Sequence, residues 1–157
     1  ARNILPLIRE NLPGARLLIA GRSPTPAITR LAETHAFELI ADPPDVAELL
    51  ARAQIVIVPL EVGGGTRLKI LEAMAAGVPV VATPLAAEGL EISDGVHVVL
   101  ANTDVELAGG VELLCTDTGR WQRQRQSARR LAMEVYGPAA ISHAVRRGLD
   151  LDLPVRA

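Results

Sequence analysis

The chain has 157 residues, of which 49% are hydrophobic and 22% charged, and its formal net charge at pH 7 is −2. This is the composition of one folded domain with a substantial core, and the charge and the three aromatic residues exclude the basic stripe and stacking platform of a nucleic-acid binder. A single cysteine, Cys115, excludes an intramolecular disulfide framework, and no apolar run approaches the ~18 residues of a membrane span.

The first half of the chain alternates between predicted helices and strands. Two patterns distinguish the predicted helices from the predicted strands. Helices show apolar residues at helical spacing, as at Ile4, Leu7 and Ile8, and strands show β-branched runs such as QIVIVPL. In chain order we predict a helix over 3–11, a strand over 15–20, a helix over 27–34, a strand over 37–41, a helix over 46–52 and a strand over 54–60.

The second half continues the alternation. Gly77 is placed to end a helix, because glycine readily adopts the left-handed conformation of a helix C-cap. We predict a helix over 66–76, strands over 78–82 and 96–100, helices over 105–114, 119–135 and 139–147, and a tail over 151–157.

Apolar strands separated by helices predict an α/β fold, a doubly wound (Rossmann-like) parallel sheet flanked by helices, over one domain at 1–150. Such folds ordinarily open with a strand, which lies at the centre of the sheet, whereas this sequence opens with a helix. We therefore expect a domain that lacks its first strand and belongs to a larger, N-terminally truncated protein. The alternative is a domain that simply starts with a helix.

A glycine-rich turn carries the clearest chemical signal. The strand predicted to end at Leu60 is followed by Gly63, Gly64 and Gly65, and a helix is predicted from Thr66. Ligands of open α/β sheets lie beyond the carboxyl ends of the strands, and helix N-termini bind anions through free N–H groups. Arg67 and Lys69 add positive charge, which favours a diphosphate. The alternative is an ordinary tight turn.

Glu72 lies one turn beyond Lys69 on the same side of this predicted helix. Its carboxylate could accept hydrogen bonds from a ribose diol while the diphosphate rests at the helix start. The alternative is a surface ion pair between Lys69 and Glu72, worth about 0.2–0.5 kcal/mol.

Residues 59–91 resemble the donor-site motif of family 4 of the GT-B-fold retaining glycosyltransferases, in the subgroup whose motif reads GGGTR-x-K-x-LEA-x-A-x-G-x-P-V-V-x-T. The matching residues are Gly63, Gly64, Gly65, Thr66, Arg67, Lys69, Leu71, Glu72, Ala73, Ala75, Gly77, Pro79, Val80, Val81 and Thr83. With the order of flanking elements, the resemblance extends from about residue 2 to residue 136.

The resemblance implies one lobe of a two-lobed, hexosyltransferase-type enzyme that transfers a sugar from a nucleotide diphosphate sugar with retention of configuration. It implies that Glu72 binds the ribose, that the amides of Gly64, Gly65 and Thr66 hold the diphosphate, and that no metal or other cofactor is needed. The acceptor, a glycan or lipid-linked saccharide, and most catalytic groups would belong to the missing N-terminal lobe. This fragment alone would then be inactive. The alternative is a stand-alone nucleotide-binding or interaction module without transfer activity.

Several positions near this motif are candidates for the donor cleft or depart from the family. The broader family has a glutamate where this chain has Gly64, and Glu61 is off register for that role. Candidate cleft residues are Gly21, Arg22, Glu61 and Glu88. For Gly21 and Arg22 the alternative is a plain turn between a strand and a helix. The segment 42–45 (DPPD) lies where the family contacts the base, but its sequence is unusual.

The segment Arg120 to Arg130 holds five arginines and Trp121. We interpret it as a solvated helix face, with contact to an anionic membrane surface as the alternative. No histidine has neighbours typical of a metal or catalytic site. We expect a cytoplasmic protein, with peripheral contact at the inner face of the membrane under the second interpretation.

Overall fold

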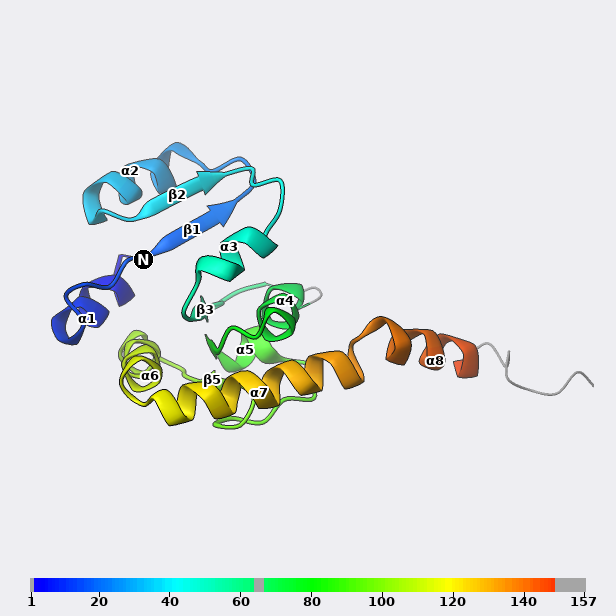
Figure 1. Cartoon of the computed structure of the whole chain (residues 1–157). Helices are drawn as coiled ribbons and strands as arrows, with labels where there is room; N and C mark the ends of the chain where they lie inside the picture. Colours follow the sequence, from blue (N-terminus) through cyan, green and yellow to red (C-terminus); the bar gives the residue numbers. More distant parts are fainter. Residues whose placement is uncertain (1, 64–66, 149–157) are drawn as a thin grey trace, which may run out of the picture.

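Parallel strands separated by helices make up the structure, a computed structural model that describes residues 2–63 and 67–148 (Figure 1). In chain order the elements are α1 (Ile4–Asn11), β1 (Leu18–Gly21), α2 (Pro26–His35), β2 (Glu38–Ala41), α3 (Ala47–Arg52), β3 (Val56–Val58), α4 (Leu68–Ala76), β4 (Val80–Ala82), α5 (Pro84–Ala87), β5 (Val99–Leu100), α6 (Asp104–Thr116), α7 (Thr118–Val135) and α8 (Pro138–Gly148). The predicted α/β class with parallel strands and flanking helices is confirmed.

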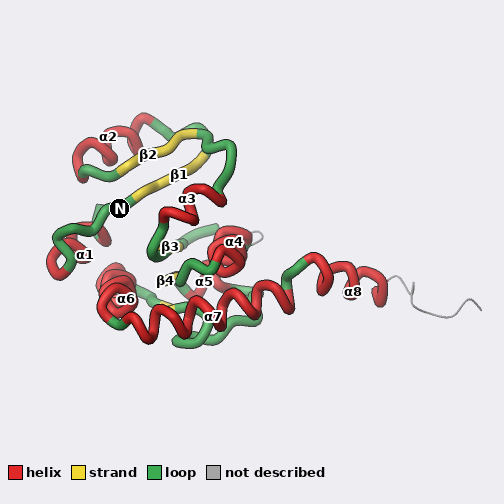
Figure 2. The backbone as a smooth tube through the Cα atoms, viewed as in Figure 1, coloured by secondary structure: helices red, strands yellow, loops and turns green. Residues whose placement is uncertain are grey.

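The strands form two separate parallel groups. β1 pairs with β2, and a second sheet has the order β3-β4-β5. Figure 2 shows the pair β1 and β2 at the top, set apart from the strands below. The order is that of a doubly wound sheet divided at its centre, where the first strand of such a sheet would lie. The sequence predicts that this strand is lacking, but not that the two halves stay unpaired.

Successive side chains of β4 point to opposite faces of the sheet, and each face has its own helix layer. Val80 and Ala82 pack with α4 and α7, whereas Val81 packs with α1 and α6. All three side chains are fully buried. This sandwich explains why a segment with almost no aromatic residues can build a core, since valine, alanine and leucine fill the space between the sheet and helices.

A smaller core lies under β1 and β2. Phe37 and Ala32 pack there with Leu5 of α1. Other α1 residues, Ile4 and Ile8, belong to the core beneath α6. Helix α1 therefore contacts both groups of strands.

The C-terminal helices α7 and α8 follow one another along the edge of the molecule, and α8 extends away from the body in Figure 1. Trp121 is held in place, because its Nε1 donates a hydrogen bond to the carbonyl of Gln54 at 2.9 Å.

Among the described residues, no helix has both the length and the apolarity needed to cross a bilayer. The predicted tail, 151–157, lies outside the described residues.

Candidate functional site

The candidate site lies at the carboxyl ends of the strands, which share one edge of the fold because the strands are parallel. The loop that follows β3 leads to α4 and carries the predicted anion-binding residues. Gly64, Gly65 and Thr66 lie outside the described residues, so their predicted contacts with a diphosphate stay predictions. The described residues before and after the loop show where it begins and ends.

The first residues of the loop are exposed, and one of them, Gly63, has a backbone conformation that favours glycine. Glu61 and Val62 are exposed, and the side chain of Val62 reaches 85% exposure. Gly63 has φ +134°, a conformation that side chains rarely adopt, although an added Cβ would lie no closer than 3.6 Å to Leu60. Glycine is therefore required at residue 63 by the backbone conformation rather than by lack of space.

Helix α4 begins at Leu68, after Arg67 at the N-cap, and its buried face consists of Ile70, Ala73 and Met74. Lys69 and Glu72 lie on the opposite, exposed side, one turn apart. Within the described residues, neither side chain makes a hydrogen bond or ion pair. The structure thus places both predicted ligands on the same side of α4 and does not contain the ion pair that was their alternative explanation.

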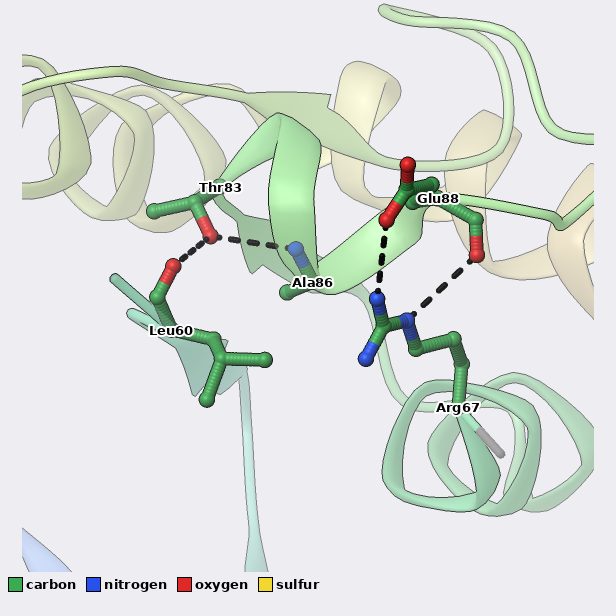
Figure 3. Close-up of polar contacts among 5 residues, drawn as sticks. All are labelled: Leu60, Arg67, Thr83, Ala86 and Glu88. Carbon is green, nitrogen blue, oxygen red and sulfur yellow. Dashed lines mark hydrogen bonds and ion pairs between the residues drawn. The ribbon is translucent and has the colours of Figure 1, made fainter. Parts of the chain in front are cut away.

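Arg67 has a different environment from Lys69. Its Nη2 lies 3.3 Å from Oε2 of Glu88, and its Nε donates to the backbone carbonyl of Glu88 at 3.4 Å (Figure 3). The side chain of Arg67 is only 10% exposed, whereas that of Glu88 is 71% exposed. The two cations predicted to act together therefore have different environments. Arg67 connects α4 to the loop after α5 through its bonds to Glu88, whereas Lys69 faces solvent.

Thr83 connects the end of β3 to the start of α5. Its hydroxyl donates to the carbonyl of Leu60 at 2.7 Å and accepts from the amide of Ala86 at 3.2 Å (Figure 3). Thr83 is 8% exposed; its bond to Ala86 is buried and its bond to Leu60 is partly buried. Thr83 matches the donor-site motif, but the motif implies no role for it. Threonine followed by Pro84 is nevertheless the signature of an N-cap with proline in the first turn.

Tyr136 is a second residue whose role the sequence does not reveal. Its hydroxyl accepts a hydrogen bond from the amide of Glu91 at 2.7 Å. This bond connects the end of α7 to the loop that also contains Glu88. Because the two residues are 45 positions apart, no local pattern predicts their contact.

A hollow of ≈ 480 Å³ opens at the same edge of the fold. It is lined by Arg2, Asn3, Ile4, Pro59, Glu61 and Asp104. Asn3 and Asp104, both in its lining, are joined by a hydrogen bond of 2.9 Å. Glu61, a predicted cleft residue, therefore lines an actual depression, although Glu88 does not belong to its lining.

The loops that follow β1 and β2 contact each other at this edge. Gly21 and Arg22, both predicted cleft residues, are exposed there and are not among the residues of the hollow. The amide of Ser23 donates to Oδ1 of Asp42 at 3.0 Å, and both residues have positive φ. Backbone strain of this kind is often found at functional sites. Asp45, just before the N-cap residue Val46, accepts from the amide of Ala47 at the start of α3 at 2.8 Å, so the unusual DPPD segment has local structural roles.

Within the described residues, the histidines are not grouped with other side chains that bind metals. In the described part of the chain, no three His, Cys, Asp or Glu side chains come together as metal ligands. His97 accepts a hydrogen bond at Nδ1 from the amide of Ser93 at 3.0 Å. Burial, and secondarily the positive charge of Arg130, lowers the pKa of His97 below its ordinary value. Its neutral ring therefore fits a role in closing the turn 93–97.

Comparison with known protein families identifies the family of this chain. The family described as glycosyl transferases group 1 matches residues 1–117. No curated protein matches the chain.

Among solved structures, Anabaena Alr3699/HepE in complex with UDP and glucose has a TM-score of 0.80 and 19% identity over 97% of this chain. The pneumococcal O-GlcNAc transferase GtfA, in complex with UDP and GlcNAc, gives 0.73 and 13% identity over 96% of this chain and 32% of its own. The C-terminal domain of LpcC, a glycosyl transferase group 1 family protein from Francisella tularensis, gives 0.69 and 17% identity over 88% of this chain and 82% of its own. This chain spans only 44% of the Anabaena protein, less than half its length.

Proposed function

The chain belongs to the glycosyl transferases group 1 family, and we propose that it is the donor-binding lobe of a retaining glycosyltransferase related to family 4. The observation that carries this proposal is the exposed side of α4, where Lys69 and Glu72 lie one turn apart without protein partners among the described residues. A diphosphate at the helix start and a ribose along the helix would satisfy both side chains.

The proposed contacts follow from the charge and geometry of the helix. The N-terminus of α4 carries a partial positive charge, and Lys69 in its first turn adds a full one. Gly64, Gly65 and Thr66 would supply backbone amides to the diphosphate, as the motif implies, and Gly63 gives the loop the conformation that precedes them. Glu72 would accept hydrogen bonds from the ribose. Glu61, Glu88, Gly21 and Arg22 remain proposed contacts of the sugar or nucleotide.

In the proposed reaction, the bond between the sugar and the diphosphate breaks and the sugar passes to an acceptor hydroxyl. The amides and cations around the diphosphate would stabilise the negative charge that develops on it as it leaves, so that no metal ion is required. We place the acceptor site and most catalytic groups in a second lobe, and we expect this chain alone to bind donor without transferring sugar. A cytoplasmic location fits the single cysteine, Cys115.

Calorimetric titration tests the proposal, beginning with UDP because two of the solved relatives hold it and continuing with GDP and ADP. Glu72→Gln should weaken binding of the preferred nucleotide by about 1–3 kcal/mol, the usual cost of losing hydrogen bonds to a charged group. The thermal stability of the chain should change little, because residue 72 is exposed.

Two controls isolate the ribose contact. Glu33→Gln alters a carboxylate that is exposed on α2, and it should leave nucleotide affinity unchanged. The 2′,3′-dideoxy nucleotide should bind equally to the native chain and to Glu72→Gln. If Glu72→Gln weakens the dideoxy and ordinary nucleotides to the same extent, Glu72 does not bind the ribose. If none of the three nucleotides binds, the donor-lobe proposal fails.

A further inference from the structure

The loop that follows α5, residues 88–92, connects the start of α4 to the end of α7. On one side it bonds to Arg67, the N-cap residue of α4. On the other side it bonds to Tyr136, the C-cap residue of α7. We propose that Tyr136 is a positioning residue for the start of α4 and acts through this bridging loop. The proposal rests on the proposed function, because α4 is the helix that would hold the donor.

Tyr136 extends from a backbone that is fixed on both sides. Its amide donates to the carbonyl of Ala132 at 3.1 Å, and Ala132 belongs to the buried core. The next residue, Gly137, is buried, and a Cβ there would overlap the backbone carbonyl oxygen of Met133. Glycine at residue 137 therefore lets the chain turn closely against the last turn of α7. The side chain of Tyr136 thus starts from a defined place.

The hydroxyl of Tyr136 bonds to the backbone of the bridging loop. It accepts a hydrogen bond from the amide of Glu91 at 2.7 Å. The two neighbours of Glu91, Leu90 and Ile92, are partly buried and pack against the core that contains Ile70 of α4. Apolar packing has no preferred direction, whereas a hydrogen bond does. The bond to Tyr136 therefore fixes the direction of a loop that its apolar side chains alone would only hold close.

Glu88, the first residue of the bridging loop, bonds to Arg67 at the start of α4. The distances are 3.3 Å from Nη2 of Arg67 to Oε2 of Glu88 and 3.4 Å from its Nε to the backbone carbonyl of Glu88 (Figure 3). Both are long for hydrogen bonds between nitrogen and oxygen. The bond to the carbonyl depends directly on where the backbone of the loop lies. A small movement of the loop would therefore break it.

The place of Arg67 determines the place of the first turn of α4. Its carbonyl accepts hydrogen bonds from the amides of Ile70 and Leu71 at 3.1 and 3.3 Å. Lys69 lies in the same turn. This turn carries the free N–H groups and the positive charge that would bind the diphosphate. Tyr136 would thus affect donor affinity without contacting the donor.

The alternative is that the bond between Tyr136 and Glu91 only stabilises the core, since α4, α7 and the bridging loop all pack on it. A bond of that kind acts on the whole of α4. A positioning residue acts on the start of α4 and leaves its end unchanged. The two explanations therefore differ in where along the helix the loss of the hydroxyl is detected.

Amide hydrogen exchange on the 157-residue chain measures this difference. Tyr136→Phe removes only the hydroxyl. The amides of Ile70 and Leu71 should then exchange at least about threefold faster. The amide of Val78, which bonds to the carbonyl of Ala73 at 2.8 Å at the other end of α4, should keep its rate. Equal acceleration at both ends, or no acceleration at Ile70 and Leu71, would overturn the proposal.

Calorimetric titration with UDP and uridine measures the consequence for the donor. Tyr136→Phe should weaken UDP at least about threefold, as expected for one hydrogen bond, and uridine much less, because the start of α4 would meet the diphosphate. The matched control is Thr116→Val, which removes a hydroxyl that donates to the carbonyl of Glu112 at 2.8 Å on α6. It should leave UDP affinity unchanged. Unchanged UDP affinity in Tyr136→Phe, or an equal loss for uridine, would count against the positioning role.

A double-mutant cycle tests whether Tyr136 acts through Arg67. Arg67→Met keeps an unbranched side chain and removes both bonds to Glu88. In that variant, Tyr136→Phe should cause no further loss of UDP affinity, because the connection is already broken. The same loss with and without Arg67 would show that Tyr136 does not act through it. If the native chain binds no nucleotide, the donor-lobe proposal fails, and the exchange rates of Ile70 and Leu71 alone decide whether Tyr136 holds the start of α4.

Discussion

Two cations two residues apart have different physical roles at the start of α4. Arg67 is nearly buried and bonds to both the carboxylate and the backbone carbonyl of Glu88, whereas Lys69 is exposed. An aliphatic stem that is covered by neighbours contributes packing as well as charge. The two residues should therefore separate experimentally, although the motif presents them as a pair.

Arg67→Ala should lower the free energy of unfolding by about 1–2 kcal/mol, because it removes charge-assisted hydrogen bonds and buried side-chain contacts. Lys69→Ala should change it by less than about 0.5 kcal/mol, as is usual for an exposed position. In the proposed site, Lys69→Ala should weaken UDP more than uridine, and this difference should shrink as salt rises. Urea denaturation and calorimetry at two salt concentrations measure both effects. Equal stability losses for the two variants would contradict this division of roles.

The sequence predicts those residues whose role is local. Gly77 ends α4 with φ +72°, as its position after the helical pattern indicates, and Gly63 adopts the positive φ for which glycine is suited. The bond between Arg67 and Glu88 joins residues 21 positions apart, and that between Thr83 and Leu60 joins residues 23 apart. Such contacts depend on how α4, α5 and β3 pack, which no short pattern encodes. The ligand contacts of Glu72 and of the glycine loop stay predictions.

At the scale of elements, two adjacent glycines of α6 have opposite packing requirements. A Cβ at Gly110 would lie 2.9 Å from Cγ1 of Val81 and 3.0 Å from Cγ1 of Val99, both in the packed interior between α6 and the sheet. A Cβ at Gly109 would meet nothing within 4 Å. Gly110 therefore allows α6 to approach the strands closely, while Gly109 only weakens the helix.

Gly109→Ala should raise the free energy of unfolding by about 0.5–1 kcal/mol, the helix-propensity difference between the two residues. Gly110→Ala gains the same propensity but overpacks the interface, so it should lower the free energy of unfolding by about 1 kcal/mol or more. Chemical denaturation of both variants measures the difference. A stabilising Gly110→Ala would show that α6 can move away from the sheet at little cost.

Most elements were predictable because their apolar spacing is clear over several turns or residues. Helix α4 begins at Leu68 rather than near Thr66, and the strand predicted over 96–100 shortens to Val99–Leu100. Helix α5 was not predicted, because four residues are too few to show a helical period. In the sequence, only Thr83 at its N-cap and Pro84 in its first turn indicate this helix.

On the scale of the whole molecule, charge is unevenly distributed. Residues 118–148 contain seven arginines and one acidic residue, Glu134, in a chain whose net charge is −2. Arg123, Arg129 and Arg130 are exposed, as both the solvated helix face and its alternative, contact with an anionic membrane surface, require. Arg125 is exposed too but lies over the ring of Trp121, with 5.3 Å from Cζ to the ring centroid. Because Trp121 is held against the body, it is not available as a membrane anchor.

Helix α8 exposes apolar side chains to solvent, whereas Trp121 is held against the body. Ile141 is 55% exposed and Val145 is 51% exposed, one helical turn apart, and Met133 of α7 is 54% exposed. Exposed apolar residues beside a basic helix are typical of segments that lie on anionic membrane surfaces. We propose that α7 and α8 together make such a contact, which would bring the donor lobe to a lipid-linked acceptor.

Co-sedimentation with vesicles tests this proposal. The chain should pellet with vesicles that contain an anionic lipid and not with neutral ones, and binding should weaken as salt rises, because surface attraction decays over a Debye length. Replacing Arg123 and Arg130 by glutamate should reduce binding at least about fivefold, since each basic residue near such a surface contributes roughly 1 kcal/mol. Arg30→Glu reverses a charge that is exposed on α2 and should have little effect. The pair Ile141→Ser and Val145→Ser should weaken the binding that persists at high salt, because that part depends on apolar burial. Equal pelleting with neutral vesicles, or an Arg30→Glu effect as large as that of the α7 changes, would instead mean that these arginines form only a solvated helix face.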